Sequence, residues 1–345
     1  MESVCSYELI EVPAPQSQPN SLEDNPQNKS AERIDKVLSV VSVGLFAYLG
    51  VCARVFLSAV SKSAETTILS KLGASFFLPN ILGTFVLGFV CGKFLEPLER
   101  LIGKHARIGI ATGFCGSCTT FASWNLHTSV SLLHGHWIDA HVLCLLTFAT
   151  SYLALLAGHQ LSALVDSAIK PTKQSNPSSL TTSLLIVLSF SVITSAVWMA
   201  AAFDYSTARR PYYVAMMFGP LGASVRYLLS LHNHKFPCFP LFTLVANLLG
   251  TTGNIAILVL GNANLEHRYM TIASYKLWFG TGISTGMMGS LSTVSTWINE
   301  VWKLSAKQCF LAYKYAFLSV ILAHFICVFV GFMWCLSGQF QLRGI

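Results

Sequence analysis

Two segments far apart in the chain carry the residues with the clearest chemical potential. The run GSCTTF at 116–121 is echoed by GSLSTV at 289–294, and Trp124 and Trp297 follow at the same spacing. Glycines clustered with hydroxyl residues in an apolar stretch favour a break in a membrane helix, where freed carbonyls need water, protein or an ion. Two such breaks that meet could direct four carbonyls at one cation. The alternative is close helix packing through small residues, as the GxxxG spacing that begins at Gly282 would allow.

An asparagine inside an apolar stretch precedes each of these segments. Asn80 begins the run NILGT and Asn247 the run NLLGT. A side-chain amide in a bilayer is costly unless it has a partner. The two asparagines therefore either join neighbouring helices, or offer their N–H donors to a dehydrated anion.

Aromatic and cationic side chains in the same stretches allow two interpretations each. Phe121, Trp124 and Trp297 are core or lipid-facing residues by default. An aromatic ring also has a positive edge, so rings presented edge-on can line a path for a small anion. Arg54 and Arg226 lie a turn or two from the ends of their stretches. The simplest interpretation is that both side chains extend to the membrane interface. The functional alternatives are a vestibule that attracts anions, or a structural tie that holds parts of the protein together.

Other candidate motifs give little support to an enzyme. Cys115 and Cys118 have CxxC spacing, but no βαβ pattern surrounds them, which disfavours a redox site. Three histidines and Asp139 cluster at 134–141, and a solvated interfacial loop explains them better than a metal site. The sequence holds no Ser/His/Asp set, HExxH motif or phosphate-binding loop.

The composition requires that lipid surrounds most of the chain. Of the 345 residues 53% are hydrophobic and only 11% are charged, against about 25% charged in ordinary globular domains. The net charge of +7 comes from residues scattered over short connecting segments. That distribution fits loops beside anionic headgroups better than a nucleic-acid surface.

Nine stretches are long enough to cross a bilayer as helices, which takes about 20 apolar residues. They lie at approximately 37–60, 75–94, 107–133, 141–165, 182–203, 212–231, 237–261, 277–302 and 314–338.

The distribution of positive residues predicts the orientation. The side that holds the N-terminus receives 13 Lys and Arg residues and the other side 7. Because cytoplasmic loops carry the excess, we expect a cytoplasmic N-terminus and an extracellular C-terminus.

An internal repeat explains the odd number of spans. The matches GxxxR, NxxGT and GSxxT recur at offsets of 172, 167 and 173 residues, in spans 1, 2 and 3 and again in spans 6, 7 and 8. Four helices return the chain to its starting side, so the unmatched span 5 inverts the second copy. Inverted repeats place sites near the midplane at their interface.

The predicted fold is therefore an all-α integral membrane protein with helices broken at spans 3 and 8. Its expected parts are a disordered cytoplasmic tail, a first four-helix repeat, a linker with span 5, a second four-helix repeat and a short C-terminal tail. These correspond to residues 1–36, 37–165, 166–211, 212–338 and 339–345.

These motifs resemble the Fluc/CrcB/FEX family of fluoride channels, in its fused eukaryotic FEX form. The resemblance covers residues 37–338, and its most specific part is the Gly-rich TTF segment at 113–125. It implies passive, selective export of fluoride through the plasma membrane, with no enzyme activity, by one chain that replaces the antiparallel dimer of bacterial relatives. We expect a monomer, and a coupled fluoride/proton antiporter or a non-conducting scaffold as the rival functions.

The resemblance also implies roles for particular residues. The implied fluoride path comprises Asn80, Asn247, Phe121, Trp124, Val294, Trp297, Thr120 and Thr293, with Arg54, Arg226 and Glu300 as vestibule or structural residues. The implied cofactor is one structural Na⁺ at the centre. Its ligands would be the backbone carbonyls of Gly116, Thr119, Gly289 and Ser292.

The second copy departs from the family pattern. Val294 replaces the first ring residue, and tryptophan stands at the second ring position of both copies, where phenylalanine is usual. The Glu that follows the motif is Glu300 in the second copy and His127 in the first. In the family each pore takes ring residues from both copies, which pairs Phe121 with Trp297 and Val294 with Trp124. We therefore expect the first pore to conduct and the second to be vestigial.

Overall fold

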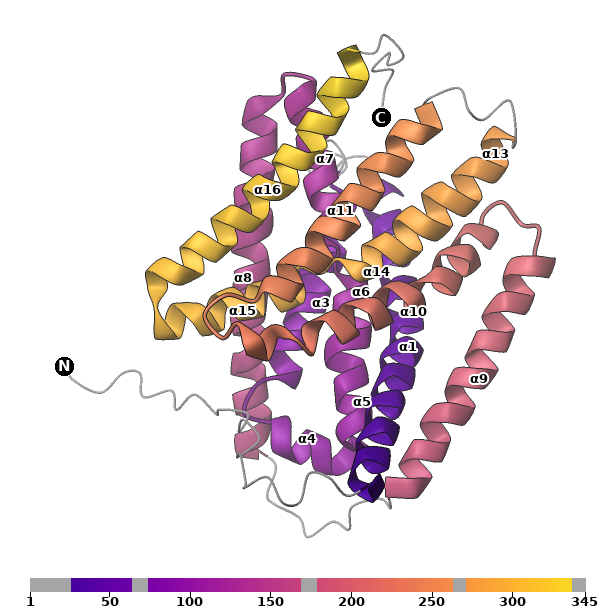
Figure 1. The fold of residues 1–345 in the computed structure, drawn as a ribbon, viewed down its shortest axis with the longest axis vertical. Helices are drawn as coiled ribbons and strands as arrows, with labels where there is room; N and C mark the ends of the chain where they lie inside the picture. Colours follow the sequence, from indigo (N-terminus) through magenta and orange to yellow (C-terminus); the bar gives the residue numbers. More distant parts are fainter. Residues whose placement is uncertain (1–25, 64–73, 169–178, 263–270, 337–345) are drawn as a thin grey trace. The chain divides into compact units, whose positions relative to one another are not determined.

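The computed structural model describes residues 26–63, 74–168, 179–262 and 271–336. Every regular element in these ranges is helical, as the sequence predicts (Figure 1). Residues 1–25 and 337–345, and the connections at 64–73, 169–178 and 263–270, lie outside the described ranges.

Six helices of the described chain are long and apolar enough to cross a membrane. They are α1 (Pro26–Ser63), α8 (Trp137–Ala168), α9 (Ser179–Phe203), α10 (Arg210–Ser230), α11 (Leu241–Asn262) and α16 (Cys309–Leu336). They correspond to spans 1, 4, 5, 6, 7 and 9 of the prediction. Span 2 contains the shorter apolar helix α3 (Phe77–Val90), which has 14 residues.

Spans 3 and 8 are not single regular helices. In span 3 the chain forms α5 (Lys104–Ile108), the π-helical stretch η1 (Gly109–Phe114), α6 (Cys115–Cys118) and α7 (Phe121–Leu133). In span 8 it forms α13 (Ile272–Tyr275), the π-helical stretch η3 (Lys276–Met288), α14 (Gly289–Leu291) and α15 (Ser295–Lys307).

Two short polar elements complete the described helices. They are α4 (Leu95–Ile102), which precedes α5, and the single 3₁₀ turn η2 (Asn233–Lys235), which follows α10. Arg107 Nε lies 2.8 Å from the Glu99 carboxylate, and this ion pair holds α4 against α5.

The first helix begins earlier than the sequence predicts. Residues 26–36 were expected in the disordered tail, but α1 starts at Pro26. Proline is suited to the first helical turn, where its missing N–H costs nothing. An ion pair of 2.6 Å between Glu32 and Lys36, one turn apart, supports this polar part of the helix.

Where the two halves of the described chain meet, each half receives one helix of the other half among its own helices. Helix α7 packs against α11 and α16 from the second half, and α15 packs against α3 and α8 from the first (Figure 1). The segments after the two interruptions therefore each lie between helices of the opposite half. This exchange brings residues about 170 positions apart into one buried region.

Helices α3 and α8 approach so closely that only glycine fits at two positions. A Cβ atom on Gly88 would lie 2.2 Å from the Leu155 carbonyl oxygen, and one on Gly158 would lie 2.2 Å from the Phe85 carbonyl oxygen. Because backbone atoms cannot move aside cheaply, any side chain at these positions must separate the helices.

We predict that Gly158→Ala destabilises the protein by about 1–3 kcal/mol, the usual cost of overpacking. The measurement is the unfolding of the purified protein in detergent. Gly280→Ala is the matched control, because a Cβ there meets no neighbouring atom within 4 Å. Equal stability of Gly158→Ala and the wild type would contradict the close approach of α3 and α8.

Candidate functional site

The backbone leaves the helical conformation at the glycine and hydroxyl segments of both halves. After α6 the backbone turns extended at Thr119, with φ −88° and ψ 155°, and stays extended at Thr120. After α14 it turns extended at Ser292, with φ −89° and ψ 154°. The matching dihedral angles show that the first residue after each break has the same conformation in both halves. The next helix begins at Phe121 in the first half and at Ser295, one position later in the repeat, in the second.

An asparagine from a neighbouring helix caps each break. The Thr120 N–H donates to Asn80 Oδ1 at 2.8 Å, and Asn80 Nδ2 donates to the Thr120 carbonyl at 3.4 Å. Asn247 makes the same two bonds to Thr293, at 2.7 and 3.2 Å. Both amides are buried. Each asparagine therefore uses its side-chain oxygen and one of its two amide protons to bind the backbone. The second amide proton remains.

Two backbone carbonyls in the first break lose the N–H donors that a continuous helix would give them. In a continuous helix the Thr120 N–H would bond to the Gly116 carbonyl, four residues earlier, but it donates to Asn80 instead. The Ser123 N–H, the helical partner of the Thr119 carbonyl, donates to Thr120 Oγ1 at 3.2 Å. The carbonyls of Gly116 and Thr119 have thus lost their helical donors.

The second break frees the two equivalent carbonyls. The Thr293 N–H, which would serve the Gly289 carbonyl, donates to Asn247. The Thr296 N–H, which would serve the Ser292 carbonyl, donates to Thr293 Oγ1 at 3.3 Å. The family resemblance implies these four carbonyls as the ligands of a cation. Because their helical donors bond elsewhere, their oxygens are available to a cation.

The two breaks lie against each other through their hydroxyl groups. Thr119 Oγ1 lies 3.1 Å from both Thr293 Oγ1 and Ser295 Oγ, and Thr120 Oγ1 lies 3.4 Å from Ser292 Oγ. The Ser295 N–H also donates to Thr119 Oγ1 at 3.2 Å. All five residues are buried. The crossing is thus a polar contact between the two halves at the centre of an apolar protein.

Two buried arginines bind the backbone near the crossing. Arg54 donates to the Thr285 carbonyl and to Ser290 Oγ, and Arg226 donates to the carbonyls of Ser290 and Thr112. Each side chain is only 3% exposed. In the described chain neither forms an ion pair with a carboxylate. Both bonds of Arg54 and the bond from Arg226 to Thr112 reach the opposite half, so the two arginines connect the halves.

The arginines also explain the glycines at the breaks. A Cβ on Gly116 would lie 2.2 Å from Arg226 Nη2, and one on Gly289 would lie 2.2 Å from Arg54 Nη1. Positive charge is therefore already present beside two of the four freed carbonyls. The oxygen donors fit a small hard cation, and the guanidinium groups compete with it electrostatically.

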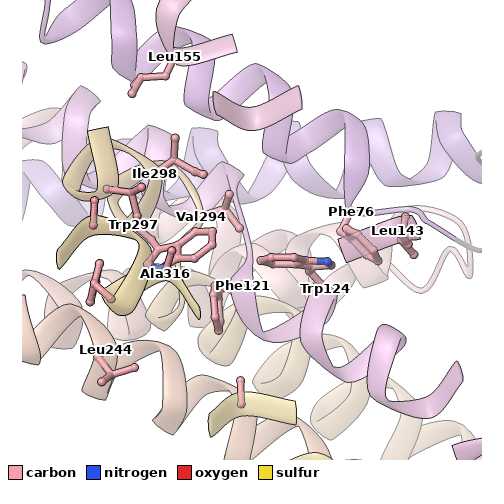
Figure 2. Close-up of a cluster of buried hydrophobic side chains, with 14 of the residues drawn as sticks. Phe76, Phe121, Trp124, Leu143, Leu155, Leu244, Val294, Trp297, Ile298 and Ala316 are labelled. Atoms are coloured by element: carbon pink, nitrogen blue, oxygen red, sulfur yellow. The ribbon is translucent and has the colours of Figure 1, made fainter. Parts of the chain in front are cut away.

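An aromatic cluster lies directly after the breaks (Figure 2). The Phe121 ring centre lies 5.4 Å from those of Trp124 and Trp297, with edge-to-face geometry in both pairs. Trp297 also lies 5.7 Å from Phe148 of α8. Val294 is fully buried in the same cluster. The structure thus brings the expected ring residues together and adds Phe148, which the sequence analysis missed.

Helix α8 adds two hydroxyl groups that the sequence analysis also missed. Thr147 Oγ1 and Ser151 Oγ are buried and have no hydrogen-bond partner among the described residues. Two hydroxyl residues one turn apart in an apolar span were the available signal. In α16, by contrast, Ser319 Oγ donates to the Tyr315 carbonyl at 2.7 Å.

Glu300 is held by polar groups in the second half. Its carboxylate accepts bonds from Thr243 Oγ1 at 2.6 Å and from the Tyr315 hydroxyl at 2.8 Å, and Asn233 Nδ2 lies 3.5 Å away. The equivalent position in the first half is His127, whose ring lies 5.7 Å from that of Phe76. The two halves therefore differ in polarity at this point.

The remaining candidates of the sequence do not assemble into a site. The histidines at 134–141 are exposed, and His136 lies 4.0 Å from Asp139. Over the described ranges no group of three potential ligands is close enough to hold a metal. Cys115 and Cys118 are buried free thiols.

We predict that Asn80→Leu and Asn247→Leu each destabilise the protein by about 1–3 kcal/mol, the cost of leaving a buried N–H unpaired. Unfolding in detergent measures the loss, and similar losses are expected because the two asparagines make the same bonds. Leu248→Met, on the same helix as Asn247, serves as a volume-conserving control. Wild-type stability in either asparagine variant would show that the break does not depend on its cap.

Comparison with known proteins reveals a family match over both halves. The family model described as CrcB-like protein, Camphor Resistance (CrcB), matches residues 41–159 and again residues 213–332. "Fluoride export protein 1" of Neurospora crassa is 26% identical over 90% of this chain and 70% of its own length. Its namesake in Candida albicans is 28% identical over 62% of this chain and 57% of its own length. The "Fluoride-specific ion channel FluC" of Chlorobium chlorochromatii is 30% identical over 36% of this chain and 92% of its own length. No solved structure was found to match.

Proposed function

We propose that the chain, which belongs to the CrcB-like family and matches its model twice, is a passive channel that exports fluoride. Its relatives are named as fluoride export proteins and fluoride-specific ion channels. The chain is a multi-pass membrane protein, and fluoride is the ion that these names point to.

The observation that carries the proposal is the pair of capped helix breaks that meet beside an aromatic cluster. A dehydrated anion in a membrane needs hydrogen-bond donors and positive ring edges, with no site strong enough to trap it. The unused amide protons of Asn80 and Asn247 and the edges of Phe121 and Trp297 offer such weak, successive contacts. Thr120 and Thr293 position both asparagines through their backbone.

We infer that only one of two pores conducts. The proposed conducting pore combines Phe121, Trp297 and the α8 residues Thr147, Phe148 and Ser151. The ring contacts around Trp297 and the two unpartnered hydroxyl groups support it.

The second pore combines Val294 with Trp124. It lacks a ring at Val294, and its Ser319 hydroxyl is bonded to its own helix. Both features weaken the path for an anion on this side.

The proposed architecture completes the nine spans. Span 2 would include α3, and spans 3 and 8 would be the two broken helices, giving inverted repeats at 37–165 and 212–338 around α9. Helix α9 is joined to the first repeat by the Tyr48 hydroxyl, which donates to Thr194 Oγ1 at 3.0 Å. We place the protein in the plasma membrane as a monomer, with the N-terminus in the cytoplasm.

Two rival functions explain less of the site. A fluoride/proton antiporter normally carries a titratable group at the midplane, whereas the crossing is built from threonine, serine and asparagine. Glu300 lies two turns beyond the break and is bound by Thr243 and Tyr315. A non-conducting scaffold has no need for two breaks that are each capped by an asparagine, because amides and carbonyls released from a helix are costly in a bilayer.

A structural Na⁺ at the crossing is part of the proposal. The carbonyls of Gly116, Thr119, Gly289 and Ser292 would hold it, and the ion would supply a fixed positive charge where both breaks end. The loss of their helical donors supports this assignment.

We predict that Phe121→Val slows fluoride efflux from liposomes by roughly tenfold, since it removes the ring edges that line the conducting pore. Val294→Ala is the matched change in the other half and is expected to slow efflux far less. The measurement uses purified protein and a fluoride electrode. Loss of efflux in Val294→Ala alone would mean that the wrong pore has been assigned.

We predict that Na⁺ stabilises the folded protein relative to N-methylglucamine at equal ionic strength. The gain should grow with Na⁺ concentration and reach about 2.7 kcal/mol at a hundred times the dissociation constant. Thermal unfolding in detergent measures it. The same midpoint in both cations would show that Arg54 and Arg226 alone supply the positive charge.

A further inference from the structure

The indole of Trp297 is a fully enclosed polar group beside the proposed path. Its side chain is 0% exposed, and rings surround it: Phe121 at 5.4 Å, Phe148 at 5.7 Å and Trp124 at 5.8 Å between ring centres. Figure 2 shows it in the buried cluster, beside Val294 and Ala316. Helix α15 carries it into contact with α3 and α8 of the opposite half.

The N–H of this indole has no acceptor among the described residues. Trp297 Nε1 is buried without a hydrogen-bond partner. Tryptophan can only donate, and an unpaired buried donor costs about 1–3 kcal/mol. A core tryptophan normally avoids this cost, because its N–H reaches an acceptor. The described residues thus leave this N–H able to donate to an acceptor that is not part of them.

The surroundings favour a small anion as that acceptor. The neighbouring rings present edges, which carry partial positive charge. On the facing helix α8, Thr147 Oγ1 and Ser151 Oγ are likewise buried and without partners in the described chain. The helix that contacts Trp297 through Phe148 therefore carries two further buried groups that can donate. The nearest carboxylate along α15, Glu300, is already bonded to Thr243 and Tyr315.

We propose that the Trp297 indole N–H donates a hydrogen bond to fluoride in transit, as a selectivity-determining contact specific to a tryptophan at this position. The inference rests on the proposed channel function. A phenylalanine would offer only ring C–H groups, whereas an N–H forms a much stronger bond to an anion. Fluoride gains most from such a donor because its small size makes its dehydration the most costly.

Trp124 provides an internal comparison. Its Nε1 is also buried without a partner in the described chain, but it belongs to the pore that Val294 leaves without a ring. In Figure 2 its nitrogen lies on the side of the indole that faces Phe76, away from Val294. We expect this N–H to be outside the path that fluoride takes.

The test is to follow the indole protons of full-length protein, labelled with ¹⁵N-tryptophan in lipid nanodiscs, during titration with NaF or NaCl. Trp297→Phe and Trp124→Phe assign the two signals. We expect fluoride to move the Trp297 proton downfield, chloride to leave it in place, and neither to move the Trp124 proton. An unmoved Trp297 signal overturns the proposal. Equal shifts with chloride overturn its selectivity, and equal shifts at Trp124 overturn its restriction to one pore.

Transport provides the second readout. Trp297→Phe should retain the fold but conduct fluoride about tenfold more slowly at low fluoride, through loss of a charge-assisted bond. Trp137→Phe, at an exposed position near the start of α8, is the control and should transport like the wild type. Wild-type efflux in Trp297→Phe counts against the proposal. If the wild type itself moves no fluoride, the proposed function fails instead, so the two failures are distinguishable.

Discussion

The hydrogen bond from a backbone N–H to an asparagine side chain is the interaction on which the rest of this structure depends. Asn80 takes the Thr120 N–H and Asn247 takes the Thr293 N–H. Each bond ends a helix inside the membrane region and still satisfies the amide that is released, which the bilayer otherwise penalises heavily. The free carbonyls of Gly116 and Gly289 follow directly from it, and the crossing hydroxyl groups and the aromatic cluster lie beside the two breaks.

The two halves share this backbone geometry but differ in the side chains around it. Both have the same asparagine cap and the same extended residue after the break. The first half supplies Phe121 and unpartnered hydroxyl groups on α8, while the second supplies Val294 and the Glu300 contact with Tyr315. A chain that matches the family model twice can diverge in this way, because mutations in one matching region need not appear in the other.

Sequence reasoning predicted the all-helical fold. It also selected the two glycine and hydroxyl segments and the asparagines Asn80 and Asn247, because small polar residues stand out in apolar stretches. It did not predict which atoms Asn80 binds, since the cap joins residues 40 positions apart. Thr147, Ser151 and Phe148 were missed because hydroxyl and aromatic residues are common in membrane helices. Only the contact with Trp297 distinguishes Phe148, and only burial without a partner distinguishes the two hydroxyl groups. The helical residues 26–36 were missed because their composition is that of a polar tail.

Passive fluoride conduction is tested by the electrical current through the purified protein in a planar bilayer, with equal pH on both sides and a fluoride gradient. The account predicts a current whose reversal potential follows the fluoride gradient alone and does not shift when a proton gradient or a chloride gradient is added. A reversal potential that moves with the proton gradient would reveal coupled exchange. No fluoride current at all would contradict the conducting path itself.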